Sequence, residues 1–392
     1  MTLSDPSGWE ISRDIFTGNQ TKAMKIAAVN NCVEVLSNSI AKLPFFIMDY
    51  KTKKHLDHSV LNLLAVRPNE AMSPSVFKKL IECQRLLSGN AYIYIERDGF
   101  GKARRLIPLP PDNVTVKSEN NFIYYVFSDK TDRIGKETVI SGENIIHLKA
   151  YSEDGINGVS VLERARQTID TAGKHQSYEN NFYGKNARPS GILTIQSSLN
   201  QDAKEKVRKE WEKVYGGVDG MFRPAVLDMG LDYKPLGINQ RDSQFIESKE
   251  ISVQDICRFF GVPLYKVQAG KQSYSSNEQN SIEYVTNTIQ PIVTQYEEEF
   301  TYKLFTDSEI NRGIEIKCNM NAELRGSYAA RSQFYRSLRE IGALSANDIR
   351  AYEDLPEIDG GDEYLASLNY IPLSEFRELS IERNSNKNGG EN

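Results

Sequence analysis

The side chains best suited to chemistry are a histidine pair and an acidic cluster near the C-terminus. His55 and His58 lie in the polar stretch KTKKHLDHS, at a spacing that two metal ligands can share. No cluster of cysteine or aspartate joins them, so the pattern favours a solvated loop. The acidic cluster consists of Glu357, Asp359, Asp362 and Glu363. It lacks the D-x-D-x-D-G spacing of a calcium loop, which favours an acidic turn. A metal-dependent nucleic-acid-processing enzyme is the alternative.

The cysteines and His147 are expected to be structural. His147 falls within an alternating strand pattern, which indicates packing. The four cysteines are far apart in the sequence, form no C-x-x-C pair and have apolar neighbours: Cys32, Cys83, Cys257 and Cys318. This distribution predicts buried free thiols in a reducing compartment.

Motifs for nucleophilic, metal or nucleotide chemistry are absent from the sequence. It contains no G-x-S-x-G, H-E-x-x-H, G-x-x-x-x-G-K-[ST] or G-x-G-x-x-G. The segment DGFGKAR resembles a phosphate loop only superficially, because no helix follows at the required place and a hairpin turn explains both glycines. The sequence therefore predicts a protein that is not an enzyme, with no catalytic residues, no metal site and no cofactor.

The composition sets limits on size and partners. A chain of 392 residues with 39% hydrophobic residues is long enough for two or three structural units. The net charge of -5 argues against a protein that grips nucleic acid over its whole surface, although it leaves room for local basic spots. The N-terminus, Met-Thr-Leu-Ser-Asp-Pro, does not have the pattern of a signal peptide, and no apolar run is long enough for a membrane span.

Helical and alternating segments together make up residues 21–150. Apolar spacing predicts a helix in KAMKIAAVNNCVEVLSNSIAKLP that Pro44 ends, and another from about Ser75 to Leu87. Alternation predicts strands in FFIMDY, NAYIYIERD, KARRLIPL, VTVKS, FIYYVF and IIHLKA. This region is therefore expected to be an α+β unit on an antiparallel sheet.

Long polar helices and a small insert follow. A helix at 161–188 has few large apolar residues, which is typical of an exposed helix or of one packed against copies of itself. The insert contains strands in GILTIQ, PAVLD and LDYKPLG and a helix opened by Asn200. A second long helix, ending near Phe260, leads through a polar loop with two lysines into a third helix from about Ser276 to Phe305.

Several motifs, taken in order, resemble the bacteriophage portal proteins of long-tailed phages and prophages. The most specific stretch is DICRFFGVPLYKV followed by SYSSNEQNSIEYVTNTIQPIVTQYEEEF. AVNNCVEVLSNSIAKLPFFIMD resembles the family's first helix, and LLAVRPNEAMSPSVFKKLIECQRLLSGNAYIYIERDGFGKARRLIPLPPDNVTV resembles the next block. NGVSVLERARQTI, NARPSGIL and RDSQFIESKEISVQDICRFFGVP match the segments around the insert. The likeness covers about residues 22–355.

The resemblance implies a portal-type α+β fold with long stem helices and named parts. These are an N-terminal arm (1–20), a wing in two parts (21–160 and 277–320), stem helices (161–188 and 241–263), a small α/β clip insert (189–240), a tunnel loop (264–276), a helical crown (321–375) and a disordered tail (376–392). The tunnel loop would project into a central channel.

The resemblance also implies partners and a location. The chain would form a homo-oligomeric ring, commonly of twelve copies, at one capsid vertex. Double-stranded DNA would pass through the channel in packaging and ejection, driven by a separate terminase motor. The other implied partners are the major capsid or scaffold protein and the head-completion and tail-adaptor proteins, with no membrane involved. The expected locations are the virion and, during assembly, the host cytoplasm. A monomeric assembly adaptor is a further alternative.

The tunnel loop supplies the residues expected to touch DNA. Lys266 and Lys271 are the candidates, with Gln268, Gln272 and Ser273 able to form weaker hydrogen bonds to phosphate. A conduit must let DNA pass, and each added phosphate contact steepens affinity, so a few lysines on an acidic chain suit the task. The alternative is an ordinary helix connection whose lysines only improve solubility.

The second stem helix carries two further cationic candidates. Lys249 and Arg258 are expected to face either the lumen or a neighbouring copy's Glu247 or Glu250. The sequence does not distinguish these two environments, since both place the cation on an exposed helix face.

Overall fold

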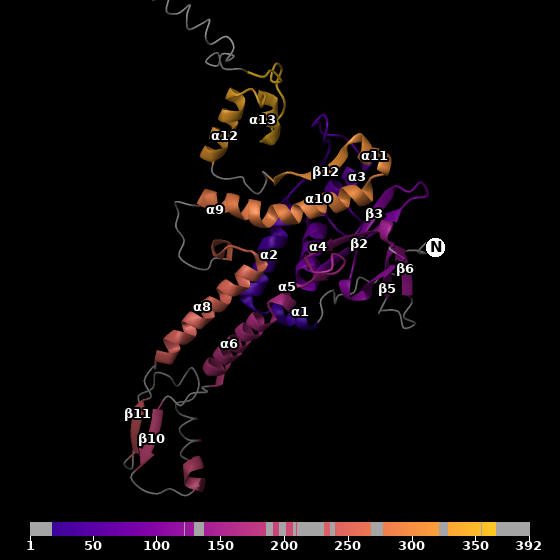
Figure 1. Ribbon diagram of the computed structural model, residues 1–392. Coiled ribbons are helices and arrows are strands. Elements are labelled where there is room, and N and C mark those ends of the chain that lie inside the picture. The colour runs from indigo at the N-terminus through magenta and orange to yellow at the C-terminus, as the bar shows by residue number, and fades with distance from the viewer. Residues whose placement is uncertain are drawn as a thin grey trace, which may run out of the picture. The chain divides into compact units, whose positions relative to one another are not determined.

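The computed structural model describes residues 18–120, 122–128, 137–185, 191–195, 201–206, 209, 231–235, 240–267, 277–320, 328–353 and 355–365 (Figure 1). The chain divides into two compact units, Met1–Glu323 and Leu324–Asn392. The first unit combines helices with antiparallel sheets, and the described part of the second is helical. The predicted α+β class is confirmed.

Two helices, α2 (Ala27–Lys42) and α4 (Pro74–Ser88), pack against each other in the first unit. The buried face of α2 includes Cys32, Leu36 and Ile40, whose spacing of three to four residues brings them onto one side. The prediction for α4 agrees to within about one residue, whereas the helix predicted from Lys22 begins five residues later, at Ala27. Gly89 ends α4 with a φ of 81°, and a Cβ there would lie 2.5 Å from the Gly158 carbonyl oxygen. Only glycine fits that close approach.

Three antiparallel sheets cover the helices of this unit. One has the order β3-β2-β7 and another the order β4-β5-β6. The third pairs β1 with β12, which joins the start of the chain to residues far along it. Their bounds are β1 Phe45–Asp49, β2 Asn90–Arg97, β3 Ala103–Leu109, β4 Val114–Glu119, β5 Phe122–Ser128, β6 Glu137–Ser141, β7 Ile145–Lys149 and β12 Ile314–Cys318. A core between the first two sheets contains Tyr92, Leu109, Tyr125, Ile140 and Ile145.

The segment DGFGKAR is the β2–β3 hairpin, as predicted. The Asp98 carboxylate accepts hydrogen bonds from the Phe100 and Lys102 amides, each at 2.9 Å. Gly101 has a φ of 80°, which glycine adopts without strain. The Asp98 side chain closes the turn and Gly101 supplies its left-handed residue, so a hairpin explains this segment without a phosphate.

A buried ion pair joins α4 to the helix α10 (Gln290–Leu304). The Arg85 guanidinium contacts the Glu82 carboxylate at 2.6 and 2.9 Å, and the Tyr296 hydroxyl donates to Glu82 Oε2 at 3.0 Å. Glu82 and Tyr296 have no solvent exposure. Because every oxygen of the carboxylate has a partner, the charge is tolerated in the interior.

The polar helices of the sequence form a neighbouring pair, α6 (Arg166–Lys185) and α8 (Gln240–Phe260), which lie side by side in Figure 1. The prediction of one continuous helix from 161 is wrong in detail. A short helix, α5 (Val161–Arg164), ends at Ala165, and α6 begins at the next residue. Ala165 is buried. The predicted strands GILTIQ and LDYKPLG correspond to an antiparallel pair of slightly shorter strands, β10 (Gly191–Ile195) and β11 (Leu231–Pro235). The PAVLD strand lies outside the described residues.

The second unit contains α12 (Tyr328–Glu340) and α13 (Ala346–Tyr352). Ser345 and Asp348 form a capping box at the start of α13, so two backbone amides find partners. The Asn347 amide binds the Ile358 carbonyl and the Asp362 carboxylate, at 3.1 and 2.8 Å. These bonds fold the acidic turn back onto α13.

The remaining described elements are short. They are α1 (Gly18–Ala23), α3 (Ser59–Leu61), η2 (Asn62–Val66), η3 (Pro111–Asn113), η4 (Gly142–Asn144), β8 (Tyr151–Ser152), β9 (Gly158–Val159), η6 (Leu264–Val267), α9 (Asn277–Tyr284), η8 (Val285–Ile289) and α11 (Asp307–Arg312). The predicted third helix is thus α9 and α10 with a π-helical segment, η8, between them.

Candidate functional site

The base of the lysine-bearing loop begins where α8 ends. Gly261 takes a φ of 68°, and the Val262 amide donates to the Cys257 carbonyl at 2.9 Å. This left-handed residue stops the helix in the manner common at helix C-termini. Pro263 then starts the 3₁₀ turn η6, in which the Lys266 amide bonds to the Pro263 carbonyl at 3.0 Å. The chain therefore turns sharply before the loop instead of continuing the helix.

Two hydrogen bonds cross between the segments on either side of the loop. The Tyr265 hydroxyl donates to the Asn280 carbonyl at 2.8 Å. The Thr288 hydroxyl donates to the Gly261 carbonyl at 2.8 Å. Because one partner of each bond precedes residues 268–276 and the other follows them, the loop is closed at its base. We call residues 261–267 and 277–289 together the loop base.

The loop base is also fixed to α2. The Asn31 amide nitrogen donates to the Val267 carbonyl at 3.3 Å, and the hydroxyls of Ser39 and Tyr284 are 3.1 Å apart. Nearby, the sulfur atoms of Cys32 and Cys257 lie 3.8 Å apart, and their hydrogen bond together with burial raises the pKa of Cys32. These contacts join segments more than 200 residues apart in the chain.

Lys266 lies within the loop base rather than at a free tip. Its ammonium group is 4.7 Å from the ring centroid of Tyr284 and 5.9 Å from that of Tyr265. The side chain is half-buried, and the Tyr284 ring is only 1% exposed. An ammonium over an aromatic face gains about 0.5–2 kcal/mol, more when desolvated. The geometry thus gives Lys266 a role in holding the base together.

The other predicted loop residues lie outside the described part of the chain: Gln268, Lys271, Gln272 and Ser273. Lys249 is on α8, where the backbone is described but its side chain is not. Arg258 is exposed and lies 2.7 Å from Asp255, one turn earlier on the same helix. The structure therefore pairs Arg258 within its own helix.

Sequence analysis did not single out the tyrosine and the asparagine that fix the loop base. Tyr284 falls in the third predicted helix, where its spacing from Val285 and Ile289 indicates only packing. Asn31 interrupts the apolar pattern of α2. This polar residue on a packed helix is the sequence feature that could have indicated the contact with the loop base. A residue of this kind usually finds a backbone partner, which here is Val267.

Metal ligation finds no support where the structure is described. Among the described residues, no group of three or more His, Cys, Asp or Glu side chains could hold a metal ion. His55 stacks on Phe46, with ring centroids 4.5 Å apart. His58 Nδ1 accepts from the Val60 amide at 3.2 Å, and its Nε2 lies 3.1 Å from Glu309. The two histidines therefore act as a stacking residue and a helix cap.

The four predicted thiols are free cysteines, with Cys32, Cys257 and Cys318 buried and Cys83 half-buried. Burial raises the pKa of Cys83 and raises that of Cys318 to about 12. A thiol with a raised pKa is a poor nucleophile near neutral pH. The environments of these two thiols are those of packing residues.

His147 is buried on β7 in the sheet β3-β2-β7, as its alternation predicted. Its Nε2 lies 2.8 Å from Asn90 Oδ1, and its Nδ1 lies 3.3 Å from the Tyr125 hydroxyl. Burial, with a smaller contribution from Lys149, lowers the pKa of His147 to about 3. The imidazole is therefore neutral near pH 7 and serves the core.

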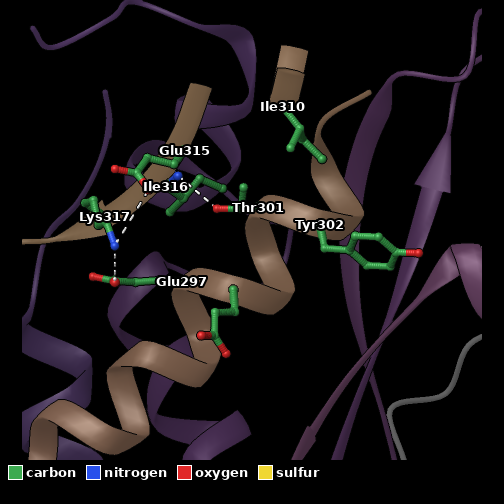
Figure 2. A pocket seen from close by; sticks show the side chains of 8 residues that line it. Glu297, Thr301, Tyr302, Ile310, Glu315, Ile316 and Lys317 are labelled. Atoms are coloured by element: carbon green, nitrogen blue, oxygen red, sulfur yellow. Dashed lines mark hydrogen bonds and ion pairs between the residues drawn. The ribbon is translucent and has the colours of Figure 1, made fainter. Parts of the chain in front are cut away.

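A shallow depression of about 240 Å³ lies between α10 and β12 (Figure 2). Glu297 accepts from the Lys317 ammonium at 3.0 Å and from the Cys318 amide at 2.8 Å. The Thr301 hydroxyl accepts from the Ile316 amide at 2.9 Å. Figure 2 shows Tyr302 pointing away from this group. The polar atoms in the depression thus serve to attach β12 to α10.

A search of the described helices finds none that is long and apolar enough to cross a membrane. The helices longest in the described part, α6 and α8, have the polar character seen in the sequence.

Comparisons with known proteins agree on one family. The model of the family described as phage portal protein matches residues 27–354. The portal protein of Enterobacteria phage HK97 is 25% identical over 376 residues, which cover 94% of this chain and 87% of that protein. The probable portal protein of Streptomyces phage phiC31 is 24% identical and covers 95% of this chain and 85% of that protein.

Solved structures show the same fold. One chain in the neck of an empty gene transfer agent (GTA) particle, with C6 symmetry, has a TM-score of 0.64 at 23% identity. The match covers 87% of this chain and 95% of that one. The crystal structure of an HK97 family phage portal protein from Corynebacterium diphtheriae has a TM-score of 0.55 at 17% identity, covering 78% of this chain and 96% of that one.

These matches confirm the predicted portal-type fold and the predicted ring-forming portal role in DNA packaging, and they give no support to a metal-dependent enzyme or a monomeric adaptor. The family is structural. With a family model that matches residues 27–354, the chain belongs to the phage portal protein family.

Proposed function

We propose that copies of this chain form a ring at one capsid vertex and that residues 268–276 project into its channel and touch the passing DNA. The observation that carries this proposal is the closed loop base. Hydrogen bonds from Tyr265 and Thr288 join the two sides of the loop, and the Asn31 bond attaches the base to α2. These bonds hold the two ends of the segment 268–276 together and fix them to the helix that supports them.

Weak attraction suits the passage of a polyanion. Duplex DNA carries about one charge per 1.7 Å of axis, and each neutralised phosphate adds to the affinity and to its salt dependence. The chain has a net charge of -5, and the segment 268–276 contains a single lysine, Lys271. A channel built from such copies contacts phosphate briefly and does not anchor it.

Within the loop, we assign different roles to the two lysines. Lys266 is occupied by the Tyr284 ring at the loop base, whereas Lys271 belongs to the segment beyond it. Lys271, helped by Gln268, Gln272 and Ser273, is the proposed phosphate contact. Lys266 sets the position of the loop from which Lys271 reaches.

The proposed partners follow from this role. A terminase motor supplies the work of packaging, so this chain needs no catalytic site of its own. The clip insert at 189–240 faces the motor first and the head-completion or tail-adaptor proteins later, and the wing faces the major capsid or scaffold protein. The ring occupies the capsid vertex in the virion and assembles in the host cytoplasm, and its copy number is commonly twelve.

The test is DNA filling of particles assembled with variant chains. The double variant Lys266→Ala and Lys271→Ala is expected to form rings and to lower DNA filling or retention. The matched control, Lys102→Ala with Lys117→Ala, removes the same charge from exposed positions in the β2–β3 hairpin and on β4, and is expected to fill normally. Loss of ring assembly with unchanged filling in the remaining particles would contradict the proposed role of the loop.

A further inference from the structure

A lysine-rich turn lies at the opposite end of the β1 strand from Phe45. Its sequence from residue 49 is DYKTKKH, with three lysines among four consecutive residues. The Asp49 amide donates to the Lys54 carbonyl at 3.0 Å, and the Lys53 amide donates to the Asp49 carbonyl at 2.8 Å. An antiparallel bridge between Met48 and His55 continues this pairing by one residue on each side. We call residues 49–55 the lysine turn.

The only acidic residue of the lysine turn is used within it. Asp49 Oδ1 accepts from the Lys51 amide at 2.8 Å, and Oδ2 accepts from the Thr52 hydroxyl at 3.0 Å. These bonds, that to the Lys51 amide foremost, lower the pKa of Asp49. Lys53 takes a φ of 57°, which non-glycine residues adopt in only a few per cent of cases. Specific hydrogen bonds therefore hold the backbone of the turn, and this backbone fixes the positions from which the lysine side chains extend.

Tyr50 connects the lysine turn to the corner between α11 and β12. Its amide donates to the Gly313 carbonyl at 2.9 Å. A Cβ at Gly313 would lie 2.9 Å from Tyr50 Cδ1, so the ring rests where only glycine leaves room. The ammonium groups of Lys51 and Lys53 lie 5.8 and 5.9 Å from this ring, and Lys51 donates to the Asn311 carbonyl at 3.4 Å. One exposed ring thus gathers two cations.

Two carboxylates near this corner, Glu309 and Glu315, have other partners. Glu309 accepts from His58, and Glu315 lies 3.8 Å from the Lys317 ammonium. Within the described part of the chain, no ion pair includes Lys51, Lys53 or Lys54. Arg312, at the end of α11, is exposed beside the turn and adds to the positive charge. The surface combines ammonium and phenol donors, which are among the side-chain groups that contact nucleic-acid phosphates.

We propose that the lysine turn is a second contact surface for duplex DNA, one that binds the phosphate backbone without regard to sequence. The proposal rests on the proposed function, because a protein that conducts a genome meets duplex DNA as its most abundant polyanion. A solvated charged turn is the ordinary alternative. The fixed backbone, the absence of ion pairs and the ring that gathers two ammonium groups together favour a site. In Figure 1, α11 is drawn at the right end of α10, whereas α9, which belongs to the loop base, is drawn at the left end, so this surface is separate from the loop base.

The test measures binding of the full chain to duplex DNA of unrelated sequence over a range of salt concentrations. The test variant combines Lys51→Gln, Lys53→Asn and Lys54→Gln, with asparagine chosen because it tolerates a positive φ. The control variant combines Lys102→Gln, Arg104→Gln and Lys117→Gln. It removes the same charge from exposed positions in the β2–β3 hairpin, on β3 and on β4. Unfolding midpoints of both variants check that the fold is retained.

Three lost phosphate contacts would reduce the salt slope of log affinity by about 2.7. The wild type is therefore expected to lose about 40-fold more affinity than the test variant over a fourfold rise in salt. The control variant is expected to keep the wild-type slope. Equal slopes for test and control variants would overturn the proposal, and so would binding of poly-glutamate but not DNA through these lysines, since that result indicates an acidic protein partner. Normal DNA filling by particles with the test variant leaves the channel role intact, so the two proposals fail separately.

Discussion

Two lysine–tyrosine contacts in the same unit serve different purposes. At the loop base, the ammonium of Lys266 lies over Tyr284, which is 1% exposed and bonded to Ser39. At the lysine turn, two ammonium groups lie near Tyr50, which is 49% exposed. The residue types are the same, and the burial of the ring differs.

The difference shows that burial of the aromatic partner decides what such a lysine can do. Over a buried ring, the ammonium is partly desolvated and its attraction to the ring approaches the upper end of about 0.5–2 kcal/mol. Near an exposed ring, water competes and the ammonium remains available to a ligand. Lys266 therefore acts as a structural anchor, while Lys51 and Lys53 act as a presented surface.

The largest expected effect separates the two rings directly. Tyr284→Ala removes a buried aromatic side chain and leaves a cavity, so the free energy of unfolding is expected to fall by about 3–5 kcal/mol. Tyr50→Ala, at an exposed position, is expected to cost less than about 1.5 kcal/mol. Urea denaturation of both variants gives the comparison, and equal losses would show that burial does not distinguish the two contacts.

Titration of the buried His147 gives a pH-dependent measure of stability in the same unit. The folded pKa of His147 is about 3, below the ordinary value of 6.5. The stability from neutral His147 is fully present above pH 6.5 and is lost as the pH falls toward 3. The slope is at most about 1.4 kcal/mol per pH unit.

The variant His147→Gln keeps a hydrogen-bonding side chain that does not titrate. The difference between the urea midpoint near neutral pH and the urea midpoint in mild acid is expected to be smaller in this variant than in the wild type. A wild type whose stability is flat across this range would contradict the neutral, buried state of His147.

A smaller effect is expected when the cation alone is removed. Lys266→Met keeps the aliphatic packing on Tyr284 and is expected to lower the free energy of unfolding by about 0.5–2 kcal/mol. Lys51→Met, near the exposed ring, is expected to change it by no more than about 0.5 kcal/mol. If both substitutions have the same small effect, the contact of Lys266 with Tyr284 does not stabilise the loop base.

The smallest expected effect concerns the bond across the loop. Tyr265→Phe removes the hydroxyl that donates to the Asn280 carbonyl, at a cost of about 1 kcal/mol. Amide hydrogen exchange in α9 is expected to become faster, because the second side of the loop loses its tie. Tyr50→Phe is the matched control and is expected to leave α9 unchanged.

The sequence predicted the parts of the fold that depend on local pattern. Apolar spacing in α4 and alternation in β2, β3 and β7 predicted those elements close to their observed bounds, and apolar spacing located α2 but placed its start five residues too early. Gly261 and Pro263 correctly marked the end of α8. These signals are local because helix ends and strand faces are set by residues within a few positions of one another.

Contacts between distant segments were not predictable from the sequence. The bonds of Asn31 to Val267 and of Ser39 to Tyr284 join positions 236 and 245 residues apart, and no spacing rule relates them. The contact of Lys266 with Tyr284 was not predictable for the same reason. A lysine in a polar stretch suggests a phosphate contact, and no local pattern shows that a tyrosine packs against it. The break at Ala165 likewise depends on packing rather than on helix propensity.

Electron cryomicroscopy of particles assembled with the full chain tests the central claim most directly. The account predicts a closed ring of copies at one vertex, with residues 268–276 directed into the channel and Lys266 against Tyr284 beside it. Single copies outside any ring, or a ring whose channel is lined by the lysine turn while residues 268–276 face outward, would contradict it.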